Sequence, residues 1–96
     1  MAGYILSPRA VSDLDEIWNY TAATWDTEQA EIYIRELWRA IETVAADPGR
    51  GRACDEIRPG YFKFLSGSHV LFYRKATKKI DIVRILHQRM DFDVHL

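Results

Sequence analysis

Five basic side chains in the second half of the chain are of the types that bind phosphate. Arginine, lysine and protonated histidine hold anionic oxygens and stabilise negative charge that develops in a reaction, as in metal-free RNA cleavage. The five are Arg58, Lys63, Arg74, Arg84 and His87. The simpler interpretation is that they are solvated strand residues or ion-pair partners of an acidic peptide. We favour it because the chain as a whole is not basic.

The three histidines show no pattern of a metal site, and no cofactor motif is present. His69, His87 and His95 lack further ligands at the right spacing on their own elements, so we expect structural or surface roles for them. Ser68 and His69 are adjacent on a predicted strand and point to opposite faces, which makes them a poor nucleophile–base pair. Gly49-Arg50-Gly51 lacks the flanking strand and helix of a phosphate-binding loop.

Length and composition predict a single domain spanning residues 1–96. Hydrophobic residues make up 48% and charged residues 28%, which is ordinary for a soluble globular protein. A formal net charge of −1 argues against a nucleic-acid-binding surface, so we expect no sequence-specific DNA binding. The single cysteine, Cys54, excludes an internal disulfide and suits the reducing cytoplasm. No signal peptide or bilayer-spanning run is seen, so we expect a cytoplasmic protein without a membrane partner.

The first half of the chain predicts a short strand and a helical hairpin. Tyr4-Ile5-Leu6 reads as an edge strand. A first helix begins at Ser7-Pro8, where serine caps the free N–H groups, and runs to about Trp25. A second helix begins at Asp26 and is stopped by Asp47-Pro48-Gly49. Because the connection between them is so short, the two helices are expected to lie antiparallel.

The second half predicts three strands and a tail. The strands are Gly60–Ser66, His69–Arg74 and Ile80–His87, and Gly67-Ser68 supplies a hairpin turn. The tail, Gln88–Leu96, alternates apolar and polar residues and is either a further strand or a flap. The order β-α-α-β-β-β indicates an α+β fold of two layers, with the helical hairpin packed on one face of an antiparallel sheet.

Both faces of this sheet carry apolar residues. The middle strand is almost continuously apolar, which is typical of a strand covered on both sides. In the last strand, period-two alternation places Ile80, Ile82, Arg84 and Leu86 on one face and Asp81, Val83, Ile85 and His87 on the other. The helices cover one face only. Since monomers seldom expose large apolar patches, we infer that a partner segment covers the other face, with the tail alone as the alternative cover.

Four stretches, in this order, resemble the ParE branch of the RelE/ParE superfamily of bacterial toxin–antitoxin toxins. They are Leu6–Tyr20, the loop and strand entry at Pro48–Gly51 and Arg58–Tyr61, the hairpin Gly67–Arg74, and the C-terminal signature Ile82–Asp91. The resemblance covers nearly the whole chain. It implies the same fold and a hetero-oligomer with a cognate ParD-like antitoxin, whose C-terminal segment folds around the toxin.

Activity divides that superfamily. RelE-like members cut mRNA in the ribosome, whereas ParE-like members trap the cleaved-DNA complex of DNA gyrase. This chain has no tyrosine after Tyr73, its net charge does not suit a ribosome ligand, and Leu86–Asp91 resembles the ParE branch. The resemblance therefore implies a gyrase inhibitor that acts by binding, without cofactor or catalytic residue.

Site residues follow from these alternatives. The antitoxin is expected to contact Leu65, Leu71, Phe72, Arg74 and Arg84. If the chain is instead a ribosome-dependent mRNA endonuclease, its nuclease set is Lys63, Arg84 and His87. A second alternative is an inactive partner-binding module, which would not stop growth when expressed without an antitoxin.

Overall fold

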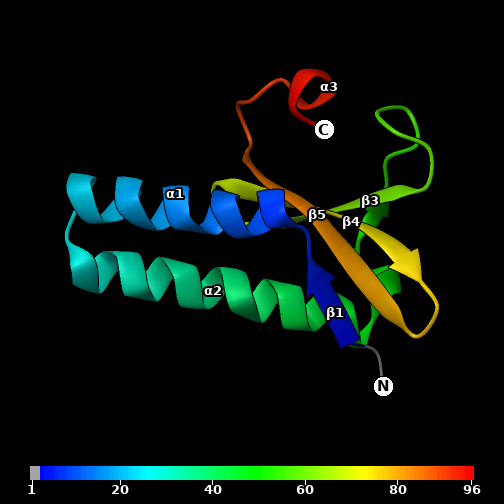
Figure 1. Ribbon diagram of the computed structural model, residues 1–96, viewed down its shortest axis with the longest axis horizontal. Coiled ribbons are helices and arrows are strands. Elements are labelled where there is room, and N and C mark those ends of the chain that lie inside the picture. Colours follow the sequence, from blue (N-terminus) through cyan, green and yellow to red (C-terminus); the bar gives the residue numbers. More distant parts are fainter. Residues whose placement is uncertain (1–2) are drawn as a thin grey trace.

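The computed structural model describes residues 3–96 and contains a five-stranded sheet with a helical hairpin on one face (Figure 1). The elements are β1 (Gly3–Leu6), α1 (Pro8–Thr24), α2 (Thr27–Ala46), η1 (Pro48–Arg50), β2 (Arg52–Ala53), β3 (Tyr61–Ser66), β4 (His69–Ala76), β5 (Lys79–His87) and α3 (Phe92–His95). The strand order is β1-β5-β4-β3-β2. The predicted two-layer α+β fold is confirmed. Within residues 3–96, no helix combines the length and apolar character that crossing a bilayer requires.

The sheet differs from the expected one at both edges. β1 pairs with β5 in parallel, so the sheet is mixed, whereas β3 to β5 form the expected antiparallel part and β2 adds to it in the same sense. Only strands joined by a tight turn must run antiparallel, and the long connection after β1 leaves its direction free. The two-residue strand β2 was not predicted, because it lies in a polar loop without strand-like alternation.

Both helices begin where the capping residues predict. The Ser7 hydroxyl accepts a hydrogen bond from the Ala10 N–H at 3.0 Å, with Pro8 in the first turn. The Asp26 carboxylate accepts from the Gln29 N–H at 2.7 Å. These caps satisfy N–H groups that have no partner inside a helix. They fix the hairpin that covers the sheet.

The main core lies between the helical hairpin and the sheet. Its fully buried members include Leu37, Ile41, Val44, Leu71, Tyr73, Ile80 and Ile82. Burying one such aliphatic side chain contributes about 1.5–3 kcal/mol. Tyr73 also anchors the loop after α2, because its hydroxyl donates to the Pro48 carbonyl at 2.6 Å and accepts from the Gly51 N–H at 3.0 Å.

A β-bulge at Val83 changes which way β5 presents its side chains. Tyr73 pairs with Ile82 and Phe72 pairs with Arg84, so Val83 has no opposite residue. The expected uniform alternation is therefore wrong beyond this point. Ile85 lies on the helix side with the strand's first isoleucines, while Arg84 lies on the other face. An extra residue resets the period of two, and neither its type nor its neighbours signal it in the sequence.

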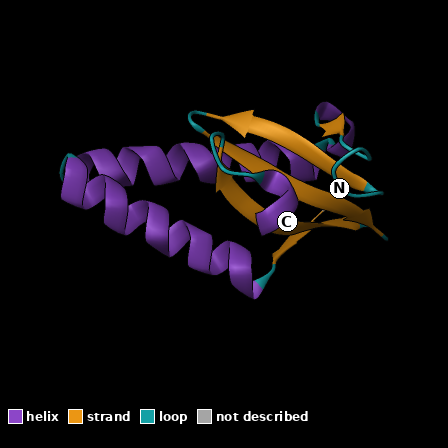
Figure 2. Ribbon diagram, turned by 90° about the horizontal axis from the view of Figure 1, so that it is seen from above, coloured by secondary structure: helices purple, strands orange, loops and turns teal. Residues whose placement is uncertain are grey.

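The tail forms a flap rather than a further strand. In α3, the Phe92 ring packs edge-on against Phe72 with centroids 4.8 Å apart. A second buried cluster forms there from Cys54, Val70, Phe72 and Leu86, with Met90, Phe92 and Leu96 packed against it. Figure 2 shows the C-terminal helix lying over the strands. The chain itself thus covers part of the face for which a partner was expected.

Candidate partner-binding surfaces

The face of the sheet that points away from the helical hairpin, called the open face here, separates two residues of the nuclease set. The register aligns Lys63, Phe72 and Arg84 in one row across β3, β4 and β5. Neighbouring strands lie about 4.8 Å apart, so roughly 10 Å separates the backbones of Lys63 and Arg84. Phe72 stands between them and is covered by Phe92. An apolar ridge thus occupies the position between the two cations.

The third residue of that set, His87, lies on the opposite face. His87 pairs with His69 at the end of the sheet, and the two rings meet edge-on with centroids 5.3 Å apart. His69 in turn contacts Tyr33 of α2, on the helix side. His87 and Arg84 both border a cavity of about 250 Å³ at the edge of β5, which Lys63 does not line. The three residues therefore do not converge on one surface.

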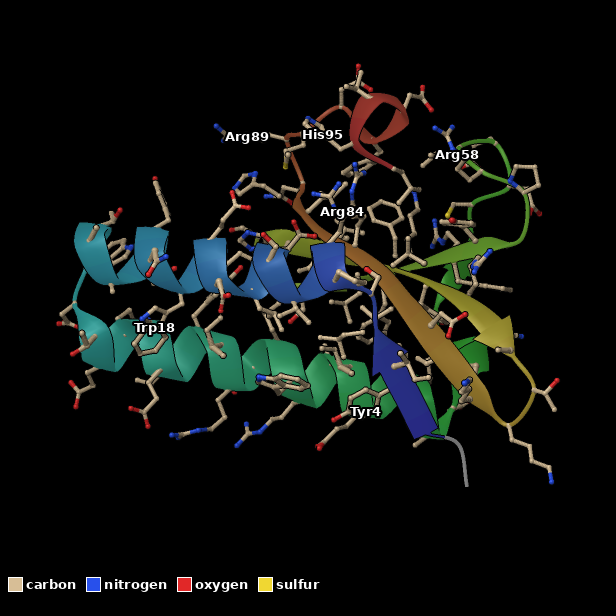
Figure 3. The ribbon with its side chains drawn as sticks, in the orientation of Figure 1. Tyr4, Trp18, Arg58, Arg84, Arg89 and His95 are labelled. Atoms are coloured by element: carbon tan, nitrogen blue, oxygen red, sulfur yellow. The ribbon has the colours of Figure 1, made fainter. Side chains whose placement is uncertain are left out.

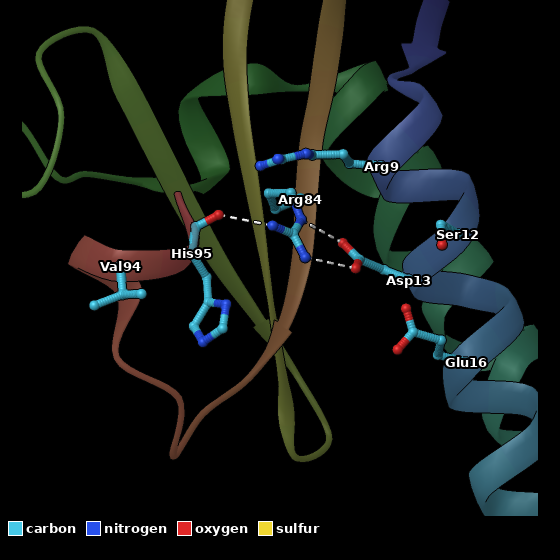
Figure 4. Close-up of a pocket in the computed structure, with 7 residues that line it drawn as sticks. All are labelled: Arg9, Ser12, Asp13, Glu16, Arg84, Val94 and His95. Atoms are coloured by element: carbon cyan, nitrogen blue, oxygen red, sulfur yellow. Dashed lines mark hydrogen bonds and ion pairs between the residues drawn. The ribbon is translucent and has the colours of Figure 1, made fainter.

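Arg84 is held inside the chain by α1 and the tail. Its Nε and Nη2 atoms each donate to an Asp13 carboxylate oxygen at 2.8 Å, and its Nη1 donates to the His95 carbonyl at 2.7 Å (Figure 4). Figure 3 labels Arg84 and His95 among the side chains of the whole molecule. The hydrogen bonds that Arg84 donates to Asp13 are the main reason that the pKa of Arg84 is raised. Asp13 also accepts the Ile85 N–H at 2.9 Å, where β1 no longer pairs with β5. The guanidinium thus already has partners.

The remaining basic residues of the predicted set are dispersed. Arg58 donates to the Asp93 carbonyl at 3.2 Å and helps to hold the tail. Arg74 lies 3.6 Å from Asp81 in a pair whose arginine side chain is half exposed. Together with the positions of Lys63, Arg84 and His87, this arrangement does not form one anion site.

The expected antitoxin-binding residues divide by exposure. Leu71 is fully buried under the helices, and Phe72 is fully buried under the tail. Arg84 is 14% exposed and internally paired. Leu65, at 62% exposure, and Arg74 remain at the surface. Leu71 and Phe72 are neighbours on a strand and face opposite sides, so one partner surface does not reach both.

A basic groove that the sequence did not indicate lies beside β2 and β3. Its volume is about 400 Å³, and it is lined by Arg50, Arg52, Lys63, Phe64 and Leu65. Within residues 3–96, no ion pair involves its three cations, which are Arg50, Arg52 and Lys63. β2 pairs only with Phe62 and Lys63, so the edge of β3 beyond it is uncovered by β2. We call this region, with its three cations and exposed leucine, the basic groove.

The sequence signal for this groove was weak. Arg50 and Arg52 lie in a loop that carries both charge signs, and they were not expected near Lys63. The β2–β3 pairing places Arg52 directly opposite Lys63. Charged residues before and after a loop are common in sequences and do not by themselves predict a shared site. Only the pairing of β2 with β3 brings Arg50 and Arg52 close to Lys63.

Solved structures of toxin–antitoxin systems share this fold. The chain matches a structure described as the chromosomal ParDE toxin–antitoxin system from P. aeruginosa with a TM-score of 0.80 and 19% identity, over 91% of this chain and 96% of that one. It matches the RelBE2 toxin–antitoxin complex from Mycobacterium tuberculosis with a TM-score of 0.64 and 20% identity, over 90% and 96%. The chain therefore has the same fold as the toxins of these two systems.

Sequence comparison narrows this class to one branch. The model of the ParE toxin of the type II toxin–antitoxin system parDE matches residues 4–92. Toxin ParE1 of Mycobacterium tuberculosis is 57% identical over 94 residues, covering 97% of this chain and 96% of that protein. Toxin ParE1 of Caulobacter vibrioides is 47% identical over 96 residues, covering 100% and 99%. The chain belongs to the ParE toxin family of type II toxin–antitoxin systems, which confirms the resemblance seen in the sequence.

Proposed function

We propose that this toxin inhibits DNA gyrase by binding, traps its cleaved-DNA complex, and is neutralised by a cognate ParD-like antitoxin. The observation that best supports binding over RNA cleavage is the dispersal of the nuclease set. Phe72 separates Lys63 from Arg84, Arg84 is paired with Asp13, and His87 faces the helices. A general acid or base must lie within hydrogen-bond reach of the reacting group. Lys63 lies across Phe72 from the cavity that Arg84 and His87 share, so the three residues do not meet that requirement together.

The basic groove supports an acidic antitoxin segment as partner. Extended peptides add to free strand edges through main-chain hydrogen bonds. The edge of β3 beyond β2 is such an edge, and Arg50, Arg52 and Lys63 lie beside it without ion-pair partners among residues 3–96. Leu65 offers an exposed apolar contact. We therefore propose that the antitoxin contacts Leu65 and the basic groove, and also the half-exposed Arg74 on β4, in a hetero-oligomer of the two proteins.

The test is a DNA-cleavage assay with the purified, antitoxin-free chain. It is mixed with gyrase, supercoiled plasmid and ATP, and the products are separated after treatment with detergent and protease. We expect linear plasmid to accumulate, and to disappear when the antitoxin is added first. Action on gyrase would place the protein in the cytoplasm. We further propose that the chain acts as a single domain and needs no cofactor.

The two alternatives give different results. A folded chain that stops growth but yields no linear DNA would contradict the gyrase proposal and favour the ribosome-dependent nuclease, with Lys63→Ala as the first variant. A chain that does neither would favour an inactive partner-binding module. Nalidixic acid, which traps the same gyrase complex, serves as the positive control for the assay.

A further inference from the structure

A cleft lies between the connected ends of α1 and α2 and the turn that joins β3 to β4. Its volume is about 560 Å³, and its lining includes Glu16, Tyr20, Trp25, Gln29, Tyr33 and His69. We call it the hairpin-tip cleft. Pockets of 300–1,000 Å³ with apolar walls and a few fixed polar groups are typical of binding sites. The basic groove has none of these residues in its lining, so the two surfaces are separate.

Two large aromatic side chains at this cleft are left in solvent. Tyr20 and Trp25, in and just after the last turn of α1, are each 72% exposed. Trp18, by contrast, is half-buried on the same helix. Exposed tryptophan and tyrosine beside a cleft are the residues that most often anchor a protein partner. Their ring faces also attract cations, and arginine more often than lysine.

The opposite wall of the cleft contains Tyr33 and His69, which are joined by a hydrogen bond. The Tyr33 hydroxyl accepts the Ser68 N–H at 3.0 Å and shares a second hydrogen bond with Nδ1 of His69. Burial is the main cause that lowers the pKa of His69 to about 4, with a contribution from the nearby His87. At neutral pH His69 therefore adds no positive charge that would repel a cation.

Glu16 is the acidic residue among those that line the cleft. Glu16 makes no hydrogen bond or ion pair among residues 3–96, although its charge helps to raise the pKa of Arg84, beside which Figure 4 draws it. Arg84 is matched by Asp13, which takes two of its N–H groups. No lysine or arginine lines the cleft. Its electrostatic preference is thus for a cation.

We propose that the hairpin-tip cleft binds the guanidinium group of an arginine presented by the toxin's cellular target. Trp25 and Tyr20 lie against the faces of the group, Glu16 accepts its N–H groups, and Gln29 offers a further amide oxygen. A planar guanidinium suits this set better than an ammonium, because it stacks on rings and donates in two directions at once. The inference rests on the proposed function, since it needs a target bound through a surface other than the antitoxin's.

The first test measures binding of the side chain alone. N-acetyl-arginine methylamide is titrated into the isotope-labelled chain, and the N-acetyl-citrulline analogue, which has the same shape without the charge, is the control probe. We expect saturable NMR shifts at the Trp25 indole and the Glu16 amide with a dissociation constant of roughly 1–10 mM. Glu16→Gln should weaken binding about fivefold. The matched control is Glu42→Gln, because Glu42 is exposed on α2 and lies outside the cleft. Equal shifts with citrulline would overturn the proposal.

The second test links the cleft to the target. Trp25→Ala is expected to reduce linear DNA in the gyrase assay at least tenfold, while its affinity for the antitoxin stays within twofold of wild type. Trp25→Phe, which keeps a ring face, should restore most of the activity. Full activity of Trp25→Ala, or loss of antitoxin binding instead, would overturn the assignment to the target. If the wild-type chain forms no cleavage complex although it binds the arginine probe, the proposed function fails and the assignment to the target fails with it.

Discussion

The Asp13 carboxylate and the Arg84 guanidinium form a two-pronged ion pair, with both N–O distances at 2.8 Å, that joins α1 to β5. Their side chains are 8% and 14% exposed. The pair sits directly after the Val83 bulge, which turns Arg84 to the open face, and Asp13 also closes the ladder by accepting the Ile85 N–H. An arginine of the type expected at a partner interface is thus part of the chain's internal scaffold.

We expect Asp13→Ala to destabilise the protein strongly. The change leaves Arg84 buried without its counter-charge and the Ile85 N–H without an acceptor, which costs about 3–5 kcal/mol of the free energy of unfolding. Urea denaturation followed by circular dichroism measures it. Asp81→Ala is the control, because its pair with half-exposed Arg74 is long, at 3.6 Å, and should contribute less than about 1 kcal/mol. Similar losses for the two variants would contradict the structural role of the Asp13–Arg84 pair.

His69 makes stability depend on pH in the acidic range. Its pKa is lowered from 6.5 to about 4 in the folded chain, so the unfolded chain binds more protons between these values. Stability should therefore fall as the pH drops from 6.5 to 4, and be unaffected by this group above 6.5. Because solvent reaches part of the ring, we expect a loss of about 1–2 kcal/mol. Thermal unfolding at several pH values tests it. His69→Gln should flatten the profile, whereas a profile unchanged by this substitution would exclude His69 as the cause.

Removing the Phe92 ring should uncover the open face. Phe92→Ala takes away the edge-on contact with Phe72 and part of the cover over the second cluster, at a cost of about 1–2 kcal/mol. We expect stronger fluorescence of an apolar dye such as ANS at pH 7 and a lower urea midpoint. Val94→Ala, on the same turn but 73% exposed, should change neither. Dye binding equal to wild type in the Phe92 variant would show that the tail does not shield this face.

The basic groove should govern affinity for the antitoxin. Reversing two charges in Arg50→Glu/Arg52→Glu is expected to weaken binding measured by calorimetry about 10- to 100-fold and to reduce its dependence on salt. The matched control is Lys78→Glu/Lys79→Glu, which changes net charge equally at the exposed β4–β5 turn outside the groove. If both double variants weaken binding alike, only general attraction is at work and the groove is not the docking site.

Local chemistry in the sequence was enough to predict the elements that position these surfaces. Ser7-Pro8 and Asp26 mark the starts of α1 and α2 as observed, because capping depends on residues within one turn. The β3–β4 hairpin follows in the same way from Gly67, which adopts a φ of +59°. Four ordered sequence stretches were also enough to identify the ParE family, which the family model and the relatives confirm.

The candidate site was less accessible from the sequence. The one-residue bulge at Val83 places Arg84 and Ile85 on faces fixed by strand pairing, not by alternation along β5. The residues expected to bind the antitoxin came from both faces of the sheet, because Leu71 lies under the helices and Phe72 lies under the tail. The basic groove, in contrast, depends on a two-residue strand that pairs Arg52 with Lys63.

The sequence by itself determined the two long helices, the main strands, their order along the chain and the family, because caps, turns and periodicity act over a few neighbouring residues. The tertiary structure alone decided which charges stay free. Asp13 and Arg84 are 71 residues apart and neutralise each other, while Arg50, Arg52 and Lys63 have no ion-pair partner among residues 3–96. A charge is compensated by whatever the fold brings within a few ångströms, and this depends on pairing between distant segments rather than on local sequence.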